Sequence, residues 1–115
     1  MARSGRIPQP STLPVAKVYK ATRGSLGRVI RGSELTEAEA VAERFTGRDI
    51  VVCGGGGRSN RDLAQRIENA IGPNFRQDPH ERAGPYALPH FQQKAPPPQG
   101  HSFYETSGKK AARNP

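Results

Sequence analysis

Hydrophobic and polar positions along the chain predict a mixed α and β fold. Residues 49–53 (DIVVC) form a continuous β-branched run, which is typical of a strand that is buried on both faces or central in a sheet. Residues 15–21 (VAKVYKA) form a shorter strand pattern without a clean apolar face, so we expect this strand at an edge. Weaker strand patterns follow in four further segments: 28–31, 74–77, 90–93 and 101–105.

A first helix is predicted after Thr36. Thr36 and Glu39 have the spacing of a capping box, and apolar residues then recur on one helical face as far as Phe45. Gly47 supplies the stop. The outer side of this helix is acidic, so we interpret it as a supporting element and not as a binding surface.

A second helix is predicted after the four glycines Gly54–Gly57. Ser59 is the expected N-cap, Gly72–Pro73 end the helix, and its apolar stripe consists of Leu63, Ala64, Ile67, Ala70 and Ile71. Glycine amides before a helix can bind phosphate, but the run lacks both the G-x-x-x-x-G-K-[ST] and the G-x-G-x-x-G pattern. We therefore favour a flexible turn over a nucleotide site. Arg58 and Arg61 on the first helical turn could still contact a nucleic-acid phosphate.

These patterns predict one small domain. Only 33% of the 115 residues are hydrophobic, and Gly and Pro together make 24 residues, so the core must be small. We expect a disordered lead or linker over 1–14, a single α+β domain over 15–106, and a basic disordered tail over 107–115. The predicted architecture is two helices packed on a small, mostly antiparallel sheet.

The charge of the chain points to an anionic partner. Eighteen Lys and Arg oppose ten Asp and Glu, which gives a net charge of +8. We expect the partner to be RNA, with tRNA in particular or DNA as further candidates. No apolar run is long enough for a spanning helix, and the N-terminus lacks the apolar centre of a signal peptide, so no membrane partner is expected. Cys53 is the only cysteine, so the chain cannot form an internal disulfide. We interpret it as a small buried hydrophobic residue in preference to a catalytic nucleophile.

All three histidines, His80, His90 and His101, lie in the Pro- and Gly-rich segment 75–105. Their spacings of ten and eleven residues differ from those of common zinc sites, although three histidines with an open position could make a catalytic zinc centre. A second interpretation is acid–base cleavage of RNA without a metal ion or a small-molecule cofactor. The third interpretation is ordinary surface histidines. The residues by themselves leave all three open.

Metal-free chemistry assigns specific roles in this segment. His90 and His101 would be the acid–base pair with His80 as a third candidate, Arg76 would clamp the phosphate, and Tyr104 would stack or donate a hydrogen bond. The side chains of the pair must then reach one phosphate, which requires a separation of roughly 5–8 Å. The predicted nucleic-acid contacts are Arg58, Arg61, Arg82, Lys94 and Tyr86.

The segments PH, AGP, LPHFQ and GHSFYE, which follow a strand, a loop and a helix, resemble the C-terminal toxin modules of bacterial polymorphic toxin systems of the Rhs and contact-dependent type. The resemblance covers roughly residues 49–105. It implies a nuclease, often a metal-independent RNase on a small α+β fold, that pairs with a cognate immunity protein. Such a module acts in the cytoplasm after delivery from another cell as part of a larger secreted protein. His80, His90, His101 and Tyr104 lie in the matching motifs.

The function expected from these observations is a metal-independent endoribonuclease of toxin type. A non-enzymatic basic module that binds nucleic acid is the first alternative. A zinc-dependent hydrolase with histidine ligands is the second.

Overall fold

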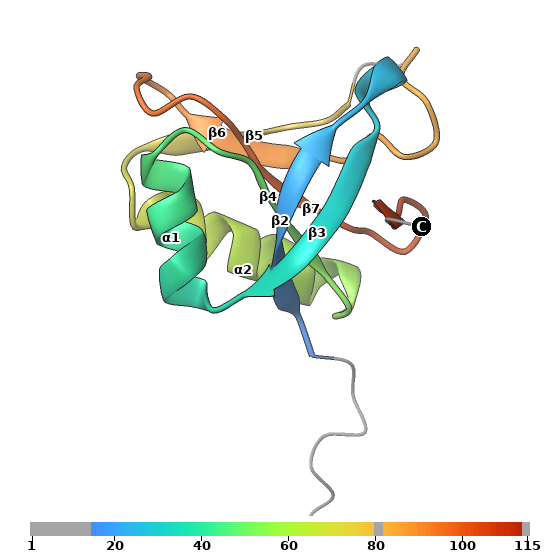
Figure 1. Cartoon of the computed structure of the whole chain (residues 1–115), viewed down its shortest axis with the longest axis horizontal. Helices are drawn as coiled ribbons and strands as arrows, with labels where there is room; N and C mark the ends of the chain where they lie inside the picture. Colours follow the sequence, from blue (N-terminus) through green and yellow to red (C-terminus); the bar gives the residue numbers. More distant parts are fainter. Residues whose placement is uncertain (1–14, 80–81, 114–115) are drawn as a thin grey trace, which may run out of the picture.

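The computed structural model of the chain describes residues 15–79 and 82–113. Within them it has two α-helices and one seven-stranded sheet, which confirms the predicted α+β class (Figure 1). In chain order the elements are β2 (Lys17–Arg23), the 3-10 turn η1 (Ser25–Gly27), β3 (Val29–Leu35), α1 (Glu37–Phe45), β4 (Ile50–Cys53), α2 (Gly57–Asn69), β5 (Asn74–Gln77), β6 (His90–Gln93), β7 (Ser102–Tyr104) and β8 (Ala112–Arg113). Neither helix in this described part is long and apolar enough to cross a membrane.

The sheet runs in the order β5-β6-β7-β4-β2-β3-β8. The pairs β2–β3, β2–β4, β5–β6 and β6–β7 are antiparallel, whereas β4–β7 and β3–β8 are parallel. The prediction of a mostly antiparallel sheet is therefore confirmed. The central strand is β4, the continuous β-branched run that the sequence predicts to be central.

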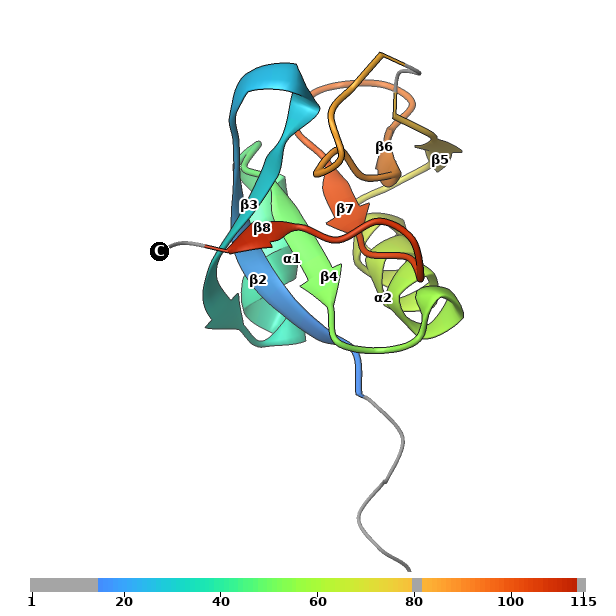
Figure 2. The ribbon, with the colours of Figure 1, turned by 90° about the vertical axis from the view of Figure 1, so that its right-hand side faces the viewer.

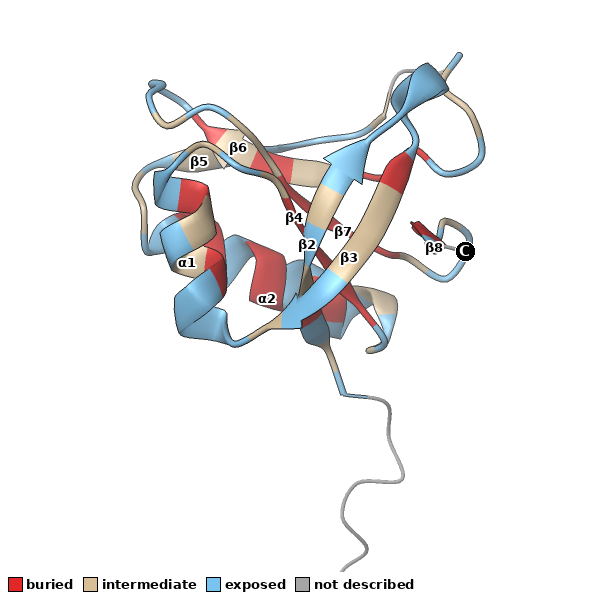
Figure 3. Cartoon of the chain, in the orientation of Figure 1, coloured by how far each residue is buried: buried red, intermediate tan, exposed pale blue. Residues whose placement is uncertain are grey.

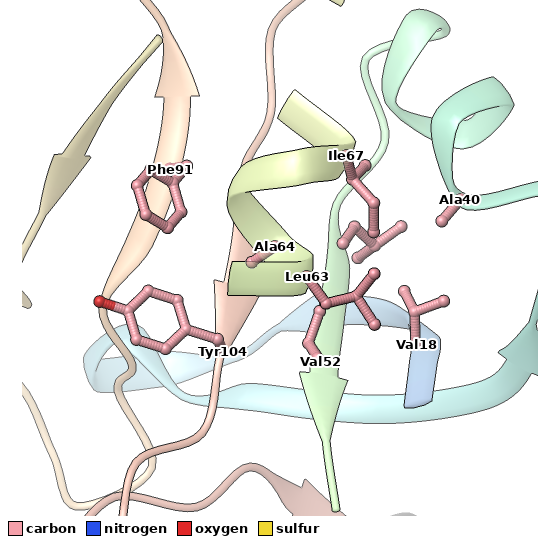
Figure 4. Packing of buried hydrophobic residues seen from close by; sticks show 9 residues of the cluster. Val18, Ala40, Val52, Leu63, Ala64, Ile67, Phe91 and Tyr104 are labelled. Atoms are coloured by element: carbon pink, nitrogen blue, oxygen red, sulfur yellow. The ribbon is translucent and has the colours of Figure 1, made fainter. Parts of the chain in front are cut away.

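Both faces of the sheet carry apolar side chains. The helices α1 and α2 lie on one face, where Ile67 and Leu63 of α2 pack with Val52 of β4, and Phe91 of β6 stacks with Tyr104 of β7 (Figures 1 and 4). On the opposite face a second cluster comes from the three strands β3, β4 and β7, the loop between β5 and β6, and the C-terminal segment; its members are Val29, Val51, Cys53, Leu88, Phe103 and Ala111. All four residues of β4 are accordingly buried (Figure 3).

Two local predictions at helix starts have different outcomes. The capping box is present: the Glu39 backbone N–H donates to Thr36 Oγ1 (3.1 Å), and the Thr36 backbone N–H donates to Glu39 Oε1 (2.8 Å). The predicted N-cap Ser59 is wrong, because α2 begins at Gly57 with Gly56 as its cap. The polar side chain that shapes this turn is Asn60, which exchanges hydrogen bonds with the backbone of Gly55 (2.9 and 3.1 Å).

The predicted edge position of the first strand is also wrong. β2 lies inside the sheet, between β4 and β3, and the strands at the two ends of the sheet are β5 and β8 (Figure 2). Of its seven residues only Val18 is buried, because Tyr19 and Ala21 pack only partly against the second cluster. The mixed pattern of apolar and polar residues in β2 therefore arises because its two faces are only partly covered by other side chains. It does not indicate an unpaired edge strand.

The disordered tail predicted over 107–115 is wrong for the part that the structure describes, which ends at Arg113. β8 pairs with β3, and Ala111 and Ala112 are buried. The buried carboxylate of Glu105 accepts hydrogen bonds from the Ala111 backbone N–H (2.8 Å) and from Arg113 Nη1 (3.1 Å). The folded domain therefore continues beyond 106, because Glu105 holds the segment against the sheet. The predicted lead over 1–14 and the last two positions, 114 and 115, lie outside the described residues.

Candidate functional site

The structure brings His90 and His101 into contact. His90 is the first residue of β6, and His101 immediately precedes β7, whose Phe103 pairs with His90 across the antiparallel ladder. The two imidazole rings meet edge to face, with their centroids 4.4 Å apart. The Phe103 ring lies 5.3 Å from each of them. The pair is thus closer than the roughly 5–8 Å expected for two groups on either side of one phosphate.

The two histidines line a pocket of about 480 Å³, called the histidine pocket below. Its other walls are the tip of the β2–β3 hairpin, the end of β5 and the loop before β6. It is lined by Arg23, Leu26, Gly27, Gln77, Asp78, Pro79, Arg82, Ala83, Ala87, Leu88, His90, Gln92, His101 and Phe103. Two arginines, Arg23 and Arg82, therefore share a concave surface with two imidazoles.

Asp49, directly before β4, orients His101. The backbone N–H of His101 donates to Asp49 Oδ1 at 2.8 Å, and the ring Nδ1 lies 3.4 Å from the same oxygen. The carboxylate can only accept, so it favours the tautomer with the proton on Nδ1 and leaves Nε2 for a reacting group. An aspartate behind the Nδ1 of a histidine is the arrangement that orients a general acid or base in many hydrolytic sites.

Arg23 completes the Asp49 site from the end of β2. Its Nε lies 3.0 Å from Asp49 Oδ2, and the Asp49 side chain is only 13% exposed. Burial raises the pKa of the Asp49 carboxyl, but the hydrogen bonds from His101 and the charge of Arg23 outweigh burial and hold that pKa below its usual value. Asp49 is therefore an anion at neutral pH, with one oxygen on a histidine and the other on an arginine.

His90 has a different environment. Its Nε2–H donates to Gln92 Oε1 at 2.7 Å. Its Nδ1 is buried and makes no hydrogen bond of good geometry within the described residues, although the Leu88 backbone lies close enough to act on it. Burial lowers the pKa of His90, the neighbouring His101 lowers it further, and the Gln92 hydrogen bond opposes both. His90 is consequently a neutral imidazole at neutral pH, which is the form that accepts a proton.

A fully buried ion pair supports the turn that carries His101. Arg44 of α1 and Glu68 of α2 both have side chains that are 0% exposed, and Arg44 Nε donates to Glu68 Oε2 at 2.6 Å. The Arg44 guanidinium also donates to the carbonyls of Gln99 (2.7 Å) and Gly100 (3.2 Å), the two residues before His101. Ser102 Oγ, directly after His101, donates to Glu68 (2.5 Å). The helices therefore hold the backbone on both sides of His101.

The predicted site residues divide between the two faces of the sheet. Strand residues alternate between faces, so Phe91 points to the helices while its neighbour His90 points away. Arg76 is paired with Phe91 in the ladder and bonds with Tyr104, whose ring packs under α2. Arg76 and Tyr104 therefore line a second pocket, together with Arg58 and Arg61. The structure corrects their predicted place beside the histidine pair, since alternation sends them to the other face.

The other predicted contacts have separate positions. Arg82 lines the histidine pocket, and Lys94 is exposed outside both pockets. Tyr86 is 42% exposed, and the Arg28 guanidinium lies 5.1 Å from the centre of its ring. His80 falls outside the described residues. Cys53 is fully buried, and burial raises the pKa of its thiol to about 12, in agreement with its interpretation as a small core hydrophobe.

Three residues of the candidate site are absent from the sequence-based prediction. Arg23 and Gln92 line the histidine pocket, and Asp49 bonds to His101. Asp49 precedes His101 by 52 positions, so no spacing motif connects them. The only sequence cue for Asp49 is that it is a charged residue at the start of a predicted strand, and many such residues are solvated surface charges. Gln92 carried a better cue, because strand alternation places it on the same face as His90.

The described part of the chain contains no complete set of ligands for a metal ion. No three His, Cys, Asp or Glu side chains gather there as they would around a metal ion. A site made of three histidines would require His80, whose placement is outside the described residues.

Comparison of the chain with protein-family models, with curated proteins and with solved structures finds no match. The candidate site therefore rests on its own geometry.

Proposed function

We propose that the protein is a metal-independent endoribonuclease whose reaction takes place in the histidine pocket. The observation that carries the proposal is the edge contact of His90 and His101, with centroids 4.4 Å apart, beside the largely buried Asp49 carboxylate. Two imidazoles in different environments, one near a carboxylate and one desolvated, are suited to separate acid and base roles. The net charge of +8 favours a polyanionic substrate.

In the proposed reaction His90 is the base. The ribose 2′-hydroxyl replaces the Gln92 oxygen at His90 Nε2, the ring proton moves to Nδ1 beside the Leu88 backbone, and Nε2 takes the hydroxyl proton. The 2′-oxygen then attacks the phosphorus. His101 acts in its doubly protonated form: Asp49 holds the proton on Nδ1, and Nε2 donates the second proton to the departing 5′-oxygen as the P–O5′ bond breaks. The products are a 2′,3′-cyclic phosphate and a free 5′-hydroxyl, so no cofactor or metal ion is required.

The arginines of the pocket would stabilise the charge that develops on the phosphate. Arg23 and Arg82 both line the histidine pocket. Preorganised cationic donors around a developing oxyanion contribute strongly to such reactions. Because the two rings already touch, the phosphate would lie over the pair on its pocket side, where these arginines are, and not between the rings.

The resemblance to toxin modules extends the proposal to the biological setting. There the protein would act on RNA in the cytoplasm of a recipient cell and would be neutralised by a cognate immunity protein. This part of the proposal is supported only by the short motifs in the segment from 49 to 105.

The test is cleavage of defined RNA with and without EDTA. The purified chain is incubated with RNA, with single-stranded DNA, and with 2′-O-methyl RNA, which lacks the attacking hydroxyl. We expect cleavage of RNA alone, insensitivity to EDTA and a cyclic phosphate end. His90→Gln and His101→Asn should each lower the rate by about a hundred- to ten-thousandfold. Lys110→Gln, a change at an exposed residue outside both pockets, is the control and should retain full activity.

Three outcomes would contradict the proposal. Intact RNA under every condition, at concentrations where the chain binds it, would favour the non-enzymatic binding module. Cleavage that EDTA abolishes would favour a metal-dependent hydrolase. Full activity in both folded histidine variants would place the chemistry elsewhere in the chain.

A further inference from the structure

A second pocket, of about 660 Å³, lies on the helix side of the sheet and is called the arginine pocket below. It is formed by the first turns of α2, by β5 and by the end of β7. Its lining includes Arg58, Arg61 and Asp62 of α2, Arg76 of β5 and Tyr104 of β7. The Tyr104 ring is buried, with Phe91 stacked on it, while its hydroxyl accepts a hydrogen bond from Arg76 Nη1 at 3.3 Å.

The charge of this pocket is strongly positive. Three arginines face it against one carboxylate of the lining, Asp62. Arg76 bonds to Asp78, which offsets part of its charge, but in the described part of the chain neither Arg58 nor Arg61 forms an ion pair or a hydrogen bond through its side chain. Like charges that converge on one pocket repel each other, and a bound anion relieves this repulsion. Arginine is also the side chain best shaped for the oxygens of a phosphate.

The arginine pocket is adjacent to the histidine pocket across a single strand. Arg76 and Gln77 are consecutive residues of β5, and they line the arginine and the histidine pocket respectively. Asp78, the hydrogen-bond partner of Arg76, also lines the histidine pocket. β5 is the end strand of the sheet, and no described strand lies beyond it. An extended chain that crosses this edge would pass from one pocket directly to the other.

We propose that the arginine pocket binds a backbone phosphate of single-stranded RNA, one or more nucleotides away from the phosphate held at the histidine pair. The identity of the polymer rests on the proposed function, whereas the binding itself needs no turnover. Arg58 and Arg61 provide the charge, and Arg76 with the Tyr104 hydroxyl orients the phosphate oxygens. The pocket would thereby align an extended strand with the reacting groups across β5.

Binding of a single-stranded 2′-O-methyl RNA oligonucleotide tests this proposal. This probe carries the phosphates but cannot undergo attack by a 2′-hydroxyl, so binding is measured without cleavage. Fluorescence anisotropy is recorded at several salt concentrations for the full chain and for Arg58→Gln/Arg61→Gln. We expect the dissociation constant of this variant to rise about tenfold or more. The slope of the logarithm of the dissociation constant against the logarithm of the salt concentration should fall in magnitude by about 1 to 2.

The matched control is Lys20→Gln/Lys110→Gln, which removes the same charge from two exposed residues outside both pockets. We expect its affinity to fall less than threefold. An equal loss of affinity in both double variants would show that RNA is attracted by the overall charge and not by the arginine pocket. Unchanged affinity in the arginine variant would refute the arginine-pocket proposal. Displacement of the oligonucleotide by inorganic phosphate at constant ionic strength would show a small-anion site instead.

The two proposals fail separately in this design. If unmodified RNA is never cleaved but the arginine variant binds the probe more weakly than the control, the arginine pocket stands and the nuclease proposal falls. If RNA is cleaved and both double variants bind alike, the nuclease proposal stands and the arginine pocket falls. Thermal unfolding curves of both variants should match that of the unchanged chain, since Arg58 and Arg61 are exposed.

Discussion

Asp49 Oδ1 lies 2.8 Å from the backbone nitrogen of His101 and 3.4 Å from its ring Nδ1, so one carboxylate oxygen positions both the backbone and the side chain of this histidine. The second oxygen of Asp49 pairs with Arg23. This contact joins the start of β4 to the start of β7, two strands that also pair directly. Asp49 thereby ties the orientation of His101 to two paired strands in the middle of the sheet.

Replacement of Asp49 by Asn should lower activity without unfolding the protein. The amide keeps the size of the side chain but removes the charge that holds the proton on Nδ1 of His101. We expect kcat/KM for RNA to fall at least about tenfold, and by less than the hundred- to ten-thousandfold expected for loss of a histidine. Glu43→Gln, which removes the partner of Arg48 at the surface, is the control and should leave kcat/KM unchanged. Equal activity of both variants would show that Asp49 has no orienting role.

The same substitution should change the pH dependence of stability. The pKa of Asp49 is lowered in the folded chain, so its contribution is fully present above the unfolded value of about 3.9 and is lost as pH falls through the lower folded value. The difference in unfolding free energy between the unchanged chain and Asp49→Asn should therefore shrink in acid. Urea unfolding at pH 7 and at successive values below pH 4 measures it.

His90 should titrate below the usual value of a histidine. Burial lowers its pKa, and the hydrogen bond to Gln92 opposes this, so Gln92→Ala should lower the midpoint further. The unfolded chain takes up the proton first, so the unfolding free energy should fall as pH decreases below about 6.5. His90→Gln should remove that slope. NMR titration of the ring protons gives the midpoint, and a value at or above 6.5 would contradict the assigned environment.

Arg44 should be among the most sensitive positions for stability. Arg44→Met leaves the Glu68 carboxylate buried without its cation, which should cost about 3–5 kcal/mol of unfolding free energy. Arg44→Met/Glu68→Leu should recover part of this loss, and not all, because Ser102 and Gln93 also bond to Glu68. The exposed pair Arg66–Glu37 is the matched control, and Arg66→Gln should cost no more than about 1 kcal/mol. Similar losses for Arg44→Met and Arg66→Gln would contradict the burial of the first pair.

Cys53 should not react with thiol reagents in the folded protein. Its side chain is fully buried, and burial raises the pKa of the thiol to about 12, so almost no thiolate is present at pH 8. A chromogenic disulfide reagent should label one thiol in urea and none in buffer over the same time. Rapid labelling of the native chain at pH 8 would show that β4 is accessible.

Several elements could be predicted from the sequence because they depend on neighbours in the chain. The β-branched run of β4 requires cover on both faces in any fold, and the capping box of Thr36 and Glu39 is complete within one helical turn. The strand positions of β5 and β6 also follow from local pattern. These features together lead to the α+β class. The short connection between β6 and β7 also favours their antiparallel pairing, which places His90 opposite Phe103, two residues from His101.

Tertiary structure alone decided which residues surround the histidine pair. The partner of His101 is Asp49, 52 positions away, and the pair Arg44–Glu68 joins two helices. The alternating directions of strand side chains send Arg76 and Tyr104 to the helix face, where a proposed catalytic arginine becomes part of a separate pocket. Local periodicities of 3.6 and 2 residues determine helices and strands, but strand order and register depend on how apolar faces pack across the whole domain.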